Sequence, residues 1–178
     1  MLMQAVVARE PATAIPQPPA AFLGAYHLHE GSLGREEATM ISGGCLCGAV
    51  RYSTNDEPIL TRLCWCRLCQ YLTTGNAAVS VCFPSKGMTI TGETRDFQSI
   101  ADSGNRMHRR FCPTCGTQLF SEGEARPHLI FVRAGTLDDP NIARPSATIW
   151  TSQVPAWACV DASLPSWEGQ PPPPTLPN

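Results

Sequence analysis

The sequence lacks several features that would point to common functional classes. Its 178 residues contain no apolar run close to the roughly 20 residues that cross a bilayer, and its beginning lacks the basic start and sustained apolar segment of a signal peptide. With 13 basic and 15 acidic residues and no basic cluster, it gives no electrostatic signal for binding nucleic acid or an anionic membrane. We therefore expect a cytoplasmic protein with neither a nucleic-acid nor a membrane partner.

Motifs of several enzyme classes are also missing. There is no Gly-rich phosphate loop, no HExxH helix, no ordered Ser-His-Asp set and no pair of carboxylates in a plausible active-site segment. Hydrolase classes therefore have no positive support, and the chemistry of cysteine remains.

The chain divides by composition into three parts. Residues 1–40 are rich in Ala, Pro and Glu without a helical or strand period, and we interpret them as a poorly ordered leader, with Met40 as an alternative start. Residues 41–168 form the predicted domain, and they contain all nine cysteines. Residues 169–178 form a proline-rich tail, because consecutive prolines cannot continue a helix or a central strand.

Stretches typical of β-strands, separated by turn residues, dominate the predicted domain. They are AVRYST, AAVSVCF, MTITGE, HLIFVRAG and SATIWT. Only the segment after Cys66 and residues 137–144 predict short helical turns. The predicted fold class is therefore mostly β, with several antiparallel strands and little helix.

Nine cysteines, grouped at short spacings, indicate metal binding rather than disulfides in a reducing compartment. Cys45 and Cys47 would face the same side of an extended strand, and the segment from Cys112 to Cys115, followed by Gly116, is a zinc knuckle by sequence. Together the two pairs offer four thiolates for a closed, structural zinc site. Iron in the same tetrahedron and disulfides remain alternatives.

The stretch CWCRLCQ supplies a second set of ligands, Cys64, Cys66 and Cys69. Neither Trp65 nor Gln70 binds zinc well, so this set has three protein ligands and an open position, which describes a reactive site. Zinc with three thiolates already carries a formal charge of about −1 and activates water weakly. A substrate thiol, held as the thiolate, suits the open position better.

Two other interpretations of this second set stay open. A distant fourth ligand would make it an inert site; the candidates are Cys82, Cys159, His108 and His128. Alternatively, Cys66 and Cys69 would cycle between dithiol and disulfide. Both Cys82 and Cys159 lie in apolar stretches, and we expect each to be a small buried residue.

Three arginines in SGNRMHRRFC suggest an anion-binding surface for a glutathione-like ligand. Strand alternation would send Arg106 and Arg110 to one face and Arg109 to the other, which favours a solvated face. Three tryptophans are expected to pack in the core or a lid rather than against substrate: Trp150, Trp157 and Trp167.

The motifs GGCLCGAVRY, CWCRLCQ and RRFCPTCGTQLF, in this order, resemble the glutathione-dependent formaldehyde-activating enzyme family, which shares its domain with centromere protein V. The resemblance runs from about Gly43 to Trp167. It implies a zinc-stabilised β-tent fold with two zinc ions per chain. It places a structural zinc at Cys45, Cys47, Cys112 and Cys115 and a catalytic zinc at Cys64, Cys66 and Cys69.

The family activity is the condensation of glutathione with formaldehyde to S-hydroxymethylglutathione, the reverse of a carbon–sulfur lyase reaction. Many relatives carry His where this chain has Trp65, so a polar role of that histidine is absent here. The sequence thus predicts a zinc-dependent carbon–sulfur lyase-type enzyme that binds a small thiol such as glutathione and forms or breaks its adduct with formaldehyde or another aldehyde. The alternatives are a non-catalytic zinc module that carries glutathione or docks a protein, and a redox protein.

Overall fold

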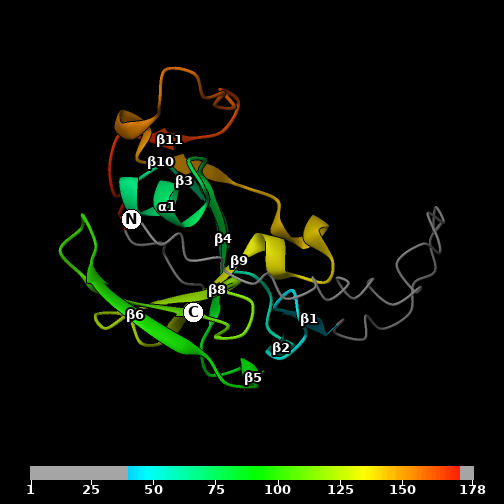
Figure 1. The fold of residues 1–178 in the computed structure, drawn as a ribbon. Coiled ribbons are helices and arrows are strands. Elements are labelled where there is room, and N and C mark those ends of the chain that lie inside the picture. The colour runs from blue at the N-terminus through cyan, green and yellow to red at the C-terminus, as the bar shows by residue number, and fades with distance from the viewer. Residues whose placement is uncertain (1–39, 173–178) are drawn as a thin grey trace, which may run out of the picture. The chain divides into compact units, whose positions relative to one another are not determined.

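The computed structural model describes residues 40–172, which fold into two β-sheets with short helical segments (Figure 1). This architecture agrees with the predicted mostly β class. Residues 1–39 and 173–178 lie outside the described residues, and so do the predicted leader and most of the predicted tail.

The smaller sheet has three strands in the order β1-β2-β5. They are β1 (Ile41–Gly44), β2 (Arg51–Thr54) and β5 (Thr89–Thr91), and both pairings are antiparallel. In β1 and β2 buried and more exposed residues alternate, so one face of this sheet packs against the core.

The larger sheet has eight strands in the order β11-β10-β3-β4-β9-β8-β7-β6. Its strand β10 runs parallel to β3 and to β11, and the other pairings are antiparallel. In chain order the strands are β3 (Leu60–Cys64), β4 (Ala78–Pro84), β6 (Arg95–Ile100), β7 (Arg106–Phe111), β8 (Gln118–Gly123), β9 (Leu129–Arg133), β10 (Ala147–Ile149) and β11 (Ser166–Trp167).

Helical structure is confined to short segments, two of them where the sequence predicted helical turns. These segments are α1 (Arg67–Leu72) and the 3-10 turns η2 (Ala134–Thr136), η3 (Pro140–Ala143) and η4 (Thr151–Gln153). In the described part of the chain, no helix has the length and apolar character needed to cross a membrane.

The hydrophobic core lies between the two sheets. Val81 and Phe83 of β4 and Val132 of β9 are fully buried, and they pack with residues of β1 and β2 in one cluster. The rings of Tyr52 and Phe120 meet edge to face, with centroids 5.3 Å apart and an interplanar angle of 73°. Burial of these large side chains supplies most of the stabilisation of the fold.

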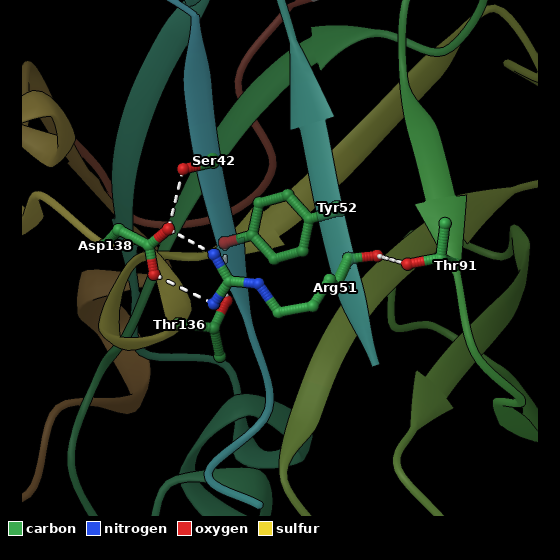
Figure 2. Close-up of polar contacts among 6 residues, drawn as sticks. All are labelled: Ser42, Arg51, Tyr52, Thr91, Thr136 and Asp138. Carbon is green, nitrogen blue, oxygen red and sulfur yellow. Dashed lines mark hydrogen bonds and ion pairs between the residues drawn. The ribbon is translucent and has the colours of Figure 1, made fainter. Parts of the chain in front are cut away.

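Polar contacts attach the smaller sheet to the segment after β9 (Figure 2). The Arg51 guanidinium donates two hydrogen bonds to the Asp138 carboxylate, which also accepts one from Ser42 at 2.6 Å. Tyr52 and Thr136 are joined through their hydroxyl groups at 2.9 Å. This network holds the strands on either side of the Cys45–Cys47 turn in place.

Gly43 in β1 is the point of closest approach in this attachment. A Cβ atom there would overlap the Tyr52 hydroxyl and the Thr136 carbonyl oxygen. Only glycine lets β1 lie this close to η2.

Candidate metal centres

Four cysteines converge where the turn after β1 meets the turn between β7 and β8. Their Sγ atoms all lie within 4.8 Å of one another, with 3.5 Å between Cys45 and Cys47 and 3.8 Å between Cys47 and Cys112. Four sulfurs at about 2.3 Å from a zinc ion would be about 3.8 Å apart, whereas a disulfide bond is about 2.05 Å long. This four-cysteine cluster, completed by Cys115, therefore fits a tetrahedral metal ion and contains no disulfide.

The first pair of ligands lies in a turn, so the predicted extended strand for Cys45 and Cys47 is wrong. The Cys45 amide donates to the Val50 carbonyl, and the Cys45 carbonyl accepts from the Gly48 amide, both at 3.0 Å. The Val50 amide donates to Cys45 Sγ at 3.2 Å. These bonds curl the chain so that both sulfurs face the cluster while Leu46 stays 67% exposed.

The second pair forms the predicted knuckle. The Gly116 amide donates to the Cys112 carbonyl at 2.9 Å, and Gly116 has φ +73°, a left-handed conformation that glycine adopts without strain. The Thr117 hydroxyl lies 3.2 Å from Cys115 Sγ and accepts a hydrogen bond from the Leu46 amide at 3.2 Å. Thr117 thus joins the two turns, a role that the sequence analysis did not identify.

The thiols of the four-cysteine cluster compete for negative charge. Burial raises the pKa of Cys115, but hydrogen bonds from the Thr117 hydroxyl and amide bring it down to about 6. A hydrogen bond from the Ala49 amide lowers the pKa of Cys47, but the neighbouring Cys45 and burial raise it to about 12. Since the four thiols cannot all ionise side by side unaided, the set is suited to a bound cation.

The second cluster consists of Cys64, Cys66 and Cys69, whose Sγ atoms also lie within 4.8 Å of one another. Cys64 ends β3, Cys66 is the N-cap residue of α1, and Cys69 lies in the first turn of this helix. The helical turn predicted after Cys66 brings Cys69 back toward Cys64 and Cys66. We call this set the three-cysteine cluster.

Gln70 holds the backbone around the three-cysteine cluster. Its side chain is 2% exposed, and its amide nitrogen donates to the Trp65 carbonyl at 2.6 Å and to the Gln153 carbonyl at 2.9 Å. The Gln70 oxygen accepts from Arg67, and the Gln153 side-chain oxygen accepts from the Arg67 amide at 2.7 Å. The helix α1 is thereby tied to η4, which lies far along the chain.

One thiolate forms easily in the three-cysteine cluster, and further thiolates do not. Hydrogen bonds from Cys64 and Cys69, with a contribution from the charge of Arg109, lower the pKa of Cys66 to about 3. The Cys66 sulfur raises the pKa of Cys64 far above its usual value. The hydrogen bond with Cys64 lowers the pKa of Cys69, but Cys66 and burial raise it to about 11. All three thiols can therefore ionise together only around a bound cation, as is also true of the four thiols of the other cluster.

The three-cysteine cluster lines a cavity of about 140 Å³. Trp150, Met107, Phe131 and Ile149 contribute apolar surface to it, and Asp102 contributes a carboxylate. Arginine and serine side chains also line it: Arg62, Ser80, Arg109, Ser121, Arg126 and Arg133. None of the residues of the four-cysteine cluster borders this cavity. Both clusters could hold a metal ion, and their sulfur ligands are consistent with zinc.

The alternation predicted for the arginines of β7 is confirmed, whereas the solvated face is wrong for Arg109. Arg106 forms an ion pair with Glu124 (3.5 Å) and Arg110 one with Glu122 (2.7 Å). Arg109 points the opposite way, is 6% exposed and lines the cavity.

The other candidates for a fourth ligand do not join the three-cysteine cluster within residues 40–172. Cys82 is fully buried, as expected, but Cys159 is exposed, so its predicted burial is wrong. His108 lies between Asp96 (Nδ1–Oδ2 2.6 Å) and Glu124 (Nε2–Oε1 3.4 Å).

The tryptophans differ from the expectation of core or lid packing. Trp157 is 68% exposed and Trp167 is 39% exposed, whereas Trp150 lines the cavity. The buried tryptophan is Trp65, within the three-cysteine cluster's own loop. Its packing there accounts for an apolar residue between two ligands.

Of the comparisons with known proteins, the match to a family agrees with the motifs. Comparison with curated proteins gives no match. Among solved structures, a Rhodobacter sphaeroides protein determined by crystallography is 21% identical, over 55% of this chain and 87% of that one, with a TM-score of 0.44. Residues 40–153, which include both cysteine clusters, match the family described as glutathione-dependent formaldehyde-activating enzyme. The chain therefore belongs to the glutathione-dependent formaldehyde-activating enzyme family.

Proposed function

We propose that this protein is a zinc-dependent enzyme of the carbon–sulfur lyase type. It binds a small thiol such as glutathione at the three-cysteine cluster and forms or breaks the adduct of this thiol with formaldehyde or another aldehyde. In the forming direction the C–S bond forms and the π bond of the carbonyl group breaks. The thiol proton ends on the carbonyl oxygen, which becomes a hydroxyl group.

The observation that supports this proposal is the difference between the two clusters. Four cysteines close the first cluster, and none of them borders the cavity. Only three cysteines form the second, and all of them do. A closed set of ligands is typical of a structural zinc site, and a set with an open position is typical of a catalytic one.

The residues of the cavity suit thiol chemistry. Zinc bound by Cys64, Cys66 and Cys69 would act as a Lewis acid that favours the thiolate form of a substrate thiol. The apolar side chains of Phe131 and Ile149 limit the water that reaches the reacting atoms. In the proposed reaction these two side chains shield the thiol from water.

The test is the rate at which labelled formaldehyde exchanges with its glutathione adduct, measured by NMR on the zinc-loaded protein. We expect the wild type to raise this rate above the uncatalysed rate in proportion to protein concentration, and Cys69→Ser to lose the increase. Cys159→Ser is the matched control, since Cys159 is exposed and belongs to neither cluster. A wild-type rate equal to the uncatalysed rate would contradict the proposal and, if glutathione still binds, would favour a carrier.

A further inference from the structure

We propose that the cavity contains an anion-binding site, formed by arginine and serine side chains of the large sheet, for a carboxylate carried by one of the compounds that react at the three-cysteine cluster. That the carboxylate belongs to a reactant rests on the proposed function. The existence of the anion site does not rest on it.

The site is built by strand register. Arg62 of β3 is paired with Ser80 of β4, and Ser80 is paired in turn with Arg133 of β9. Arg109 of β7 is paired with Ser121 of β8. Across β8 and β9 Ser121 is paired with Phe131, which lies two residues before Arg133 and so on the same face of β9. The two groups therefore project from one face of the sheet and form a polar row, offset by two residues at β9, that borders the cavity.

Serines rather than carboxylates hold the two central guanidinium groups. Arg133 donates to Ser80 Oγ at 2.8 Å and to Ser121 Oγ at 2.9 Å, and its buried Nε has no hydrogen-bond partner. Arg109 donates to Ser99 Oγ and is 6% exposed. Hydroxyl groups fix the orientation of these cations without neutralising them.

Elsewhere in residues 40–172 an arginine either is exposed to water without an ion pair, as Arg67, Arg95 and Arg144 are, or meets a carboxylate. Arg51, Arg106 and Arg110 each form an ion pair with a carboxylate. Within residues 40–172 no carboxylate lies within ion-pair distance of the four arginines that line the cavity, which are Arg62, Arg109, Arg126 and Arg133. Removing a charge from water without a partner is unfavourable, so a cavity with this lining favours an anionic ligand.

The cysteines do not account for all of this charge. A zinc ion with three thiolates contributes about one net negative charge, and Asp102, the carboxylate that lines the cavity, contributes another. Two of the four arginine charges then remain uncompensated. A guanidinium group binds a carboxylate through two parallel hydrogen bonds, which matches the free donors of this row.

The volume of the cavity limits what it encloses. A cavity of roughly 150 Å³ in another protein holds a molecule the size of benzene, and this one measures about 140 Å³. A carboxylate with a few further atoms fits. The carboxylate belongs either to the thiol, as in glutathione, or to the aldehyde partner, as in an oxo acid.

The experiment measures dissociation constants by NMR titration on the zinc-loaded full chain. The probes are S-methylglutathione, which has carboxylates but no free thiol, and glycolate, a two-carbon hydroxy acid, with ethylene glycol as the uncharged counterpart. The variants are Arg109→Gln, Arg133→Gln and Arg133→Lys. The matched control is Arg144→Gln, because Arg144 is exposed and does not border the cavity.

We expect at least one of the two acids to bind the wild type and the control, with binding that weakens as salt is added, while ethylene glycol does not bind. Each arginine-to-glutamine change should weaken binding roughly tenfold to hundredfold, since hydrogen bonds to charged groups are among the stronger ones. Arg133→Lys should weaken it by less, because lysine keeps the positive charge. Tighter binding of S-methylglutathione than of glycolate would place the carboxylate on the thiol, and binding of glycolate without binding of S-methylglutathione would place it on the aldehyde side.

The inference is overturned if neither acid binds the wild type, or if the Arg109 and Arg133 variants, shown to be folded by retention of both metal ions, bind as the wild type does. The salt dependence in the wild type keeps the test decisive if a variant does not fold, because salt-independent binding would also overturn it. None of the probes carries a thiol and no aldehyde is present in the titration, so the result does not depend on whether the protein catalyses the proposed reaction.

Discussion

Replacement of Gln70 by leucine should destabilise both the fold and the three-cysteine cluster. Leucine fills a similar volume but cannot donate to the carbonyls of Trp65 and Gln153, which Gln70 reaches at 2.6 and 2.9 Å. The buried Trp65 carbonyl left without a partner costs about 1–3 kcal/mol, and loss of the part-buried bond to the Gln153 carbonyl costs about 1 kcal/mol. We therefore expect the free energy of unfolding to fall by about 2–4 kcal/mol, a large share of the roughly 5–15 kcal/mol of a typical domain.

Two assays together test this reasoning about Gln70. Denaturant titration of the zinc-loaded protein gives the free energy of unfolding, and competition with a coloured chelator gives the rate of zinc release from each site. We expect one of the two zinc ions to leave faster in Gln70→Leu and the other to be unaffected. Tyr71→Ala, on the exposed side of the same helix, should change the stability by less than about 1 kcal/mol. An unchanged unfolding midpoint together with an unchanged release rate would refute the assigned role of Gln70.

Two further predictions concern the metal sites and pH. Cys115→Ser should unfold the domain because it opens the four-cysteine cluster. Cys69→Ser should stay folded, and mass spectrometry should show that it has lost about one of two zinc ions. Equal stability of the two variants would contradict the division into structural and reactive sites. The hydrogen bond to Asp96 raises the pKa of His108 above 6.5, so the stabilisation from this pair is fully present below that value and is lost as pH rises through the raised pKa. Unfolding midpoints at about pH 5.5 and about pH 9 should therefore differ by more in the wild type than in His108→Gln, and the same difference in both would argue against the pair.

The cysteine pairs and the triplet that make up the two clusters could be predicted from the sequence, because each of them depends on local spacing. Cys112 and Cys115 are brought together by a single turn, and Gly116 supplies the backbone conformation that this turn requires. Cys45 and Cys47 do lie together with the second pair, but in a turn rather than on the predicted extended strand. Alternation on a strand and a tight turn can both bring such a pair to one ion, and the ligand pattern does not distinguish them.

Other features could not be predicted because they depend on contacts between distant segments. The segments RDFQSI and RMHRRF are rich in charged and polar residues, which usually indicates a solvated surface. They nevertheless form β6 and β7. Their polar composition suits these positions, because β6 is an exposed edge strand and one face of β7 borders a polar cavity. The row of arginines and serines appears only when the register of five strands is known.

Gln70 shows the same limit in a different way. The Gln70 side chain is a poor ligand for zinc, so a search of the sequence for metal ligands does not select it. Its role depends on the Gln153 carbonyl, which the fold brings beside α1. A short ligand motif thus identifies the atoms that bind a metal, whereas the residues that fix the positions of those atoms come from elsewhere in the chain.

The two clusters also differ in when their ligands become available during synthesis. Cys64, Cys66 and Cys69 lie within one short stretch, whereas Cys47 and Cys112 are 65 residues apart. The three-cysteine cluster is therefore complete on the ribosome while half of the four-cysteine cluster has not yet been made. Metal available early in translation would meet the three-cysteine cluster first, and the four-cysteine cluster can close only after the β7–β8 turn has emerged.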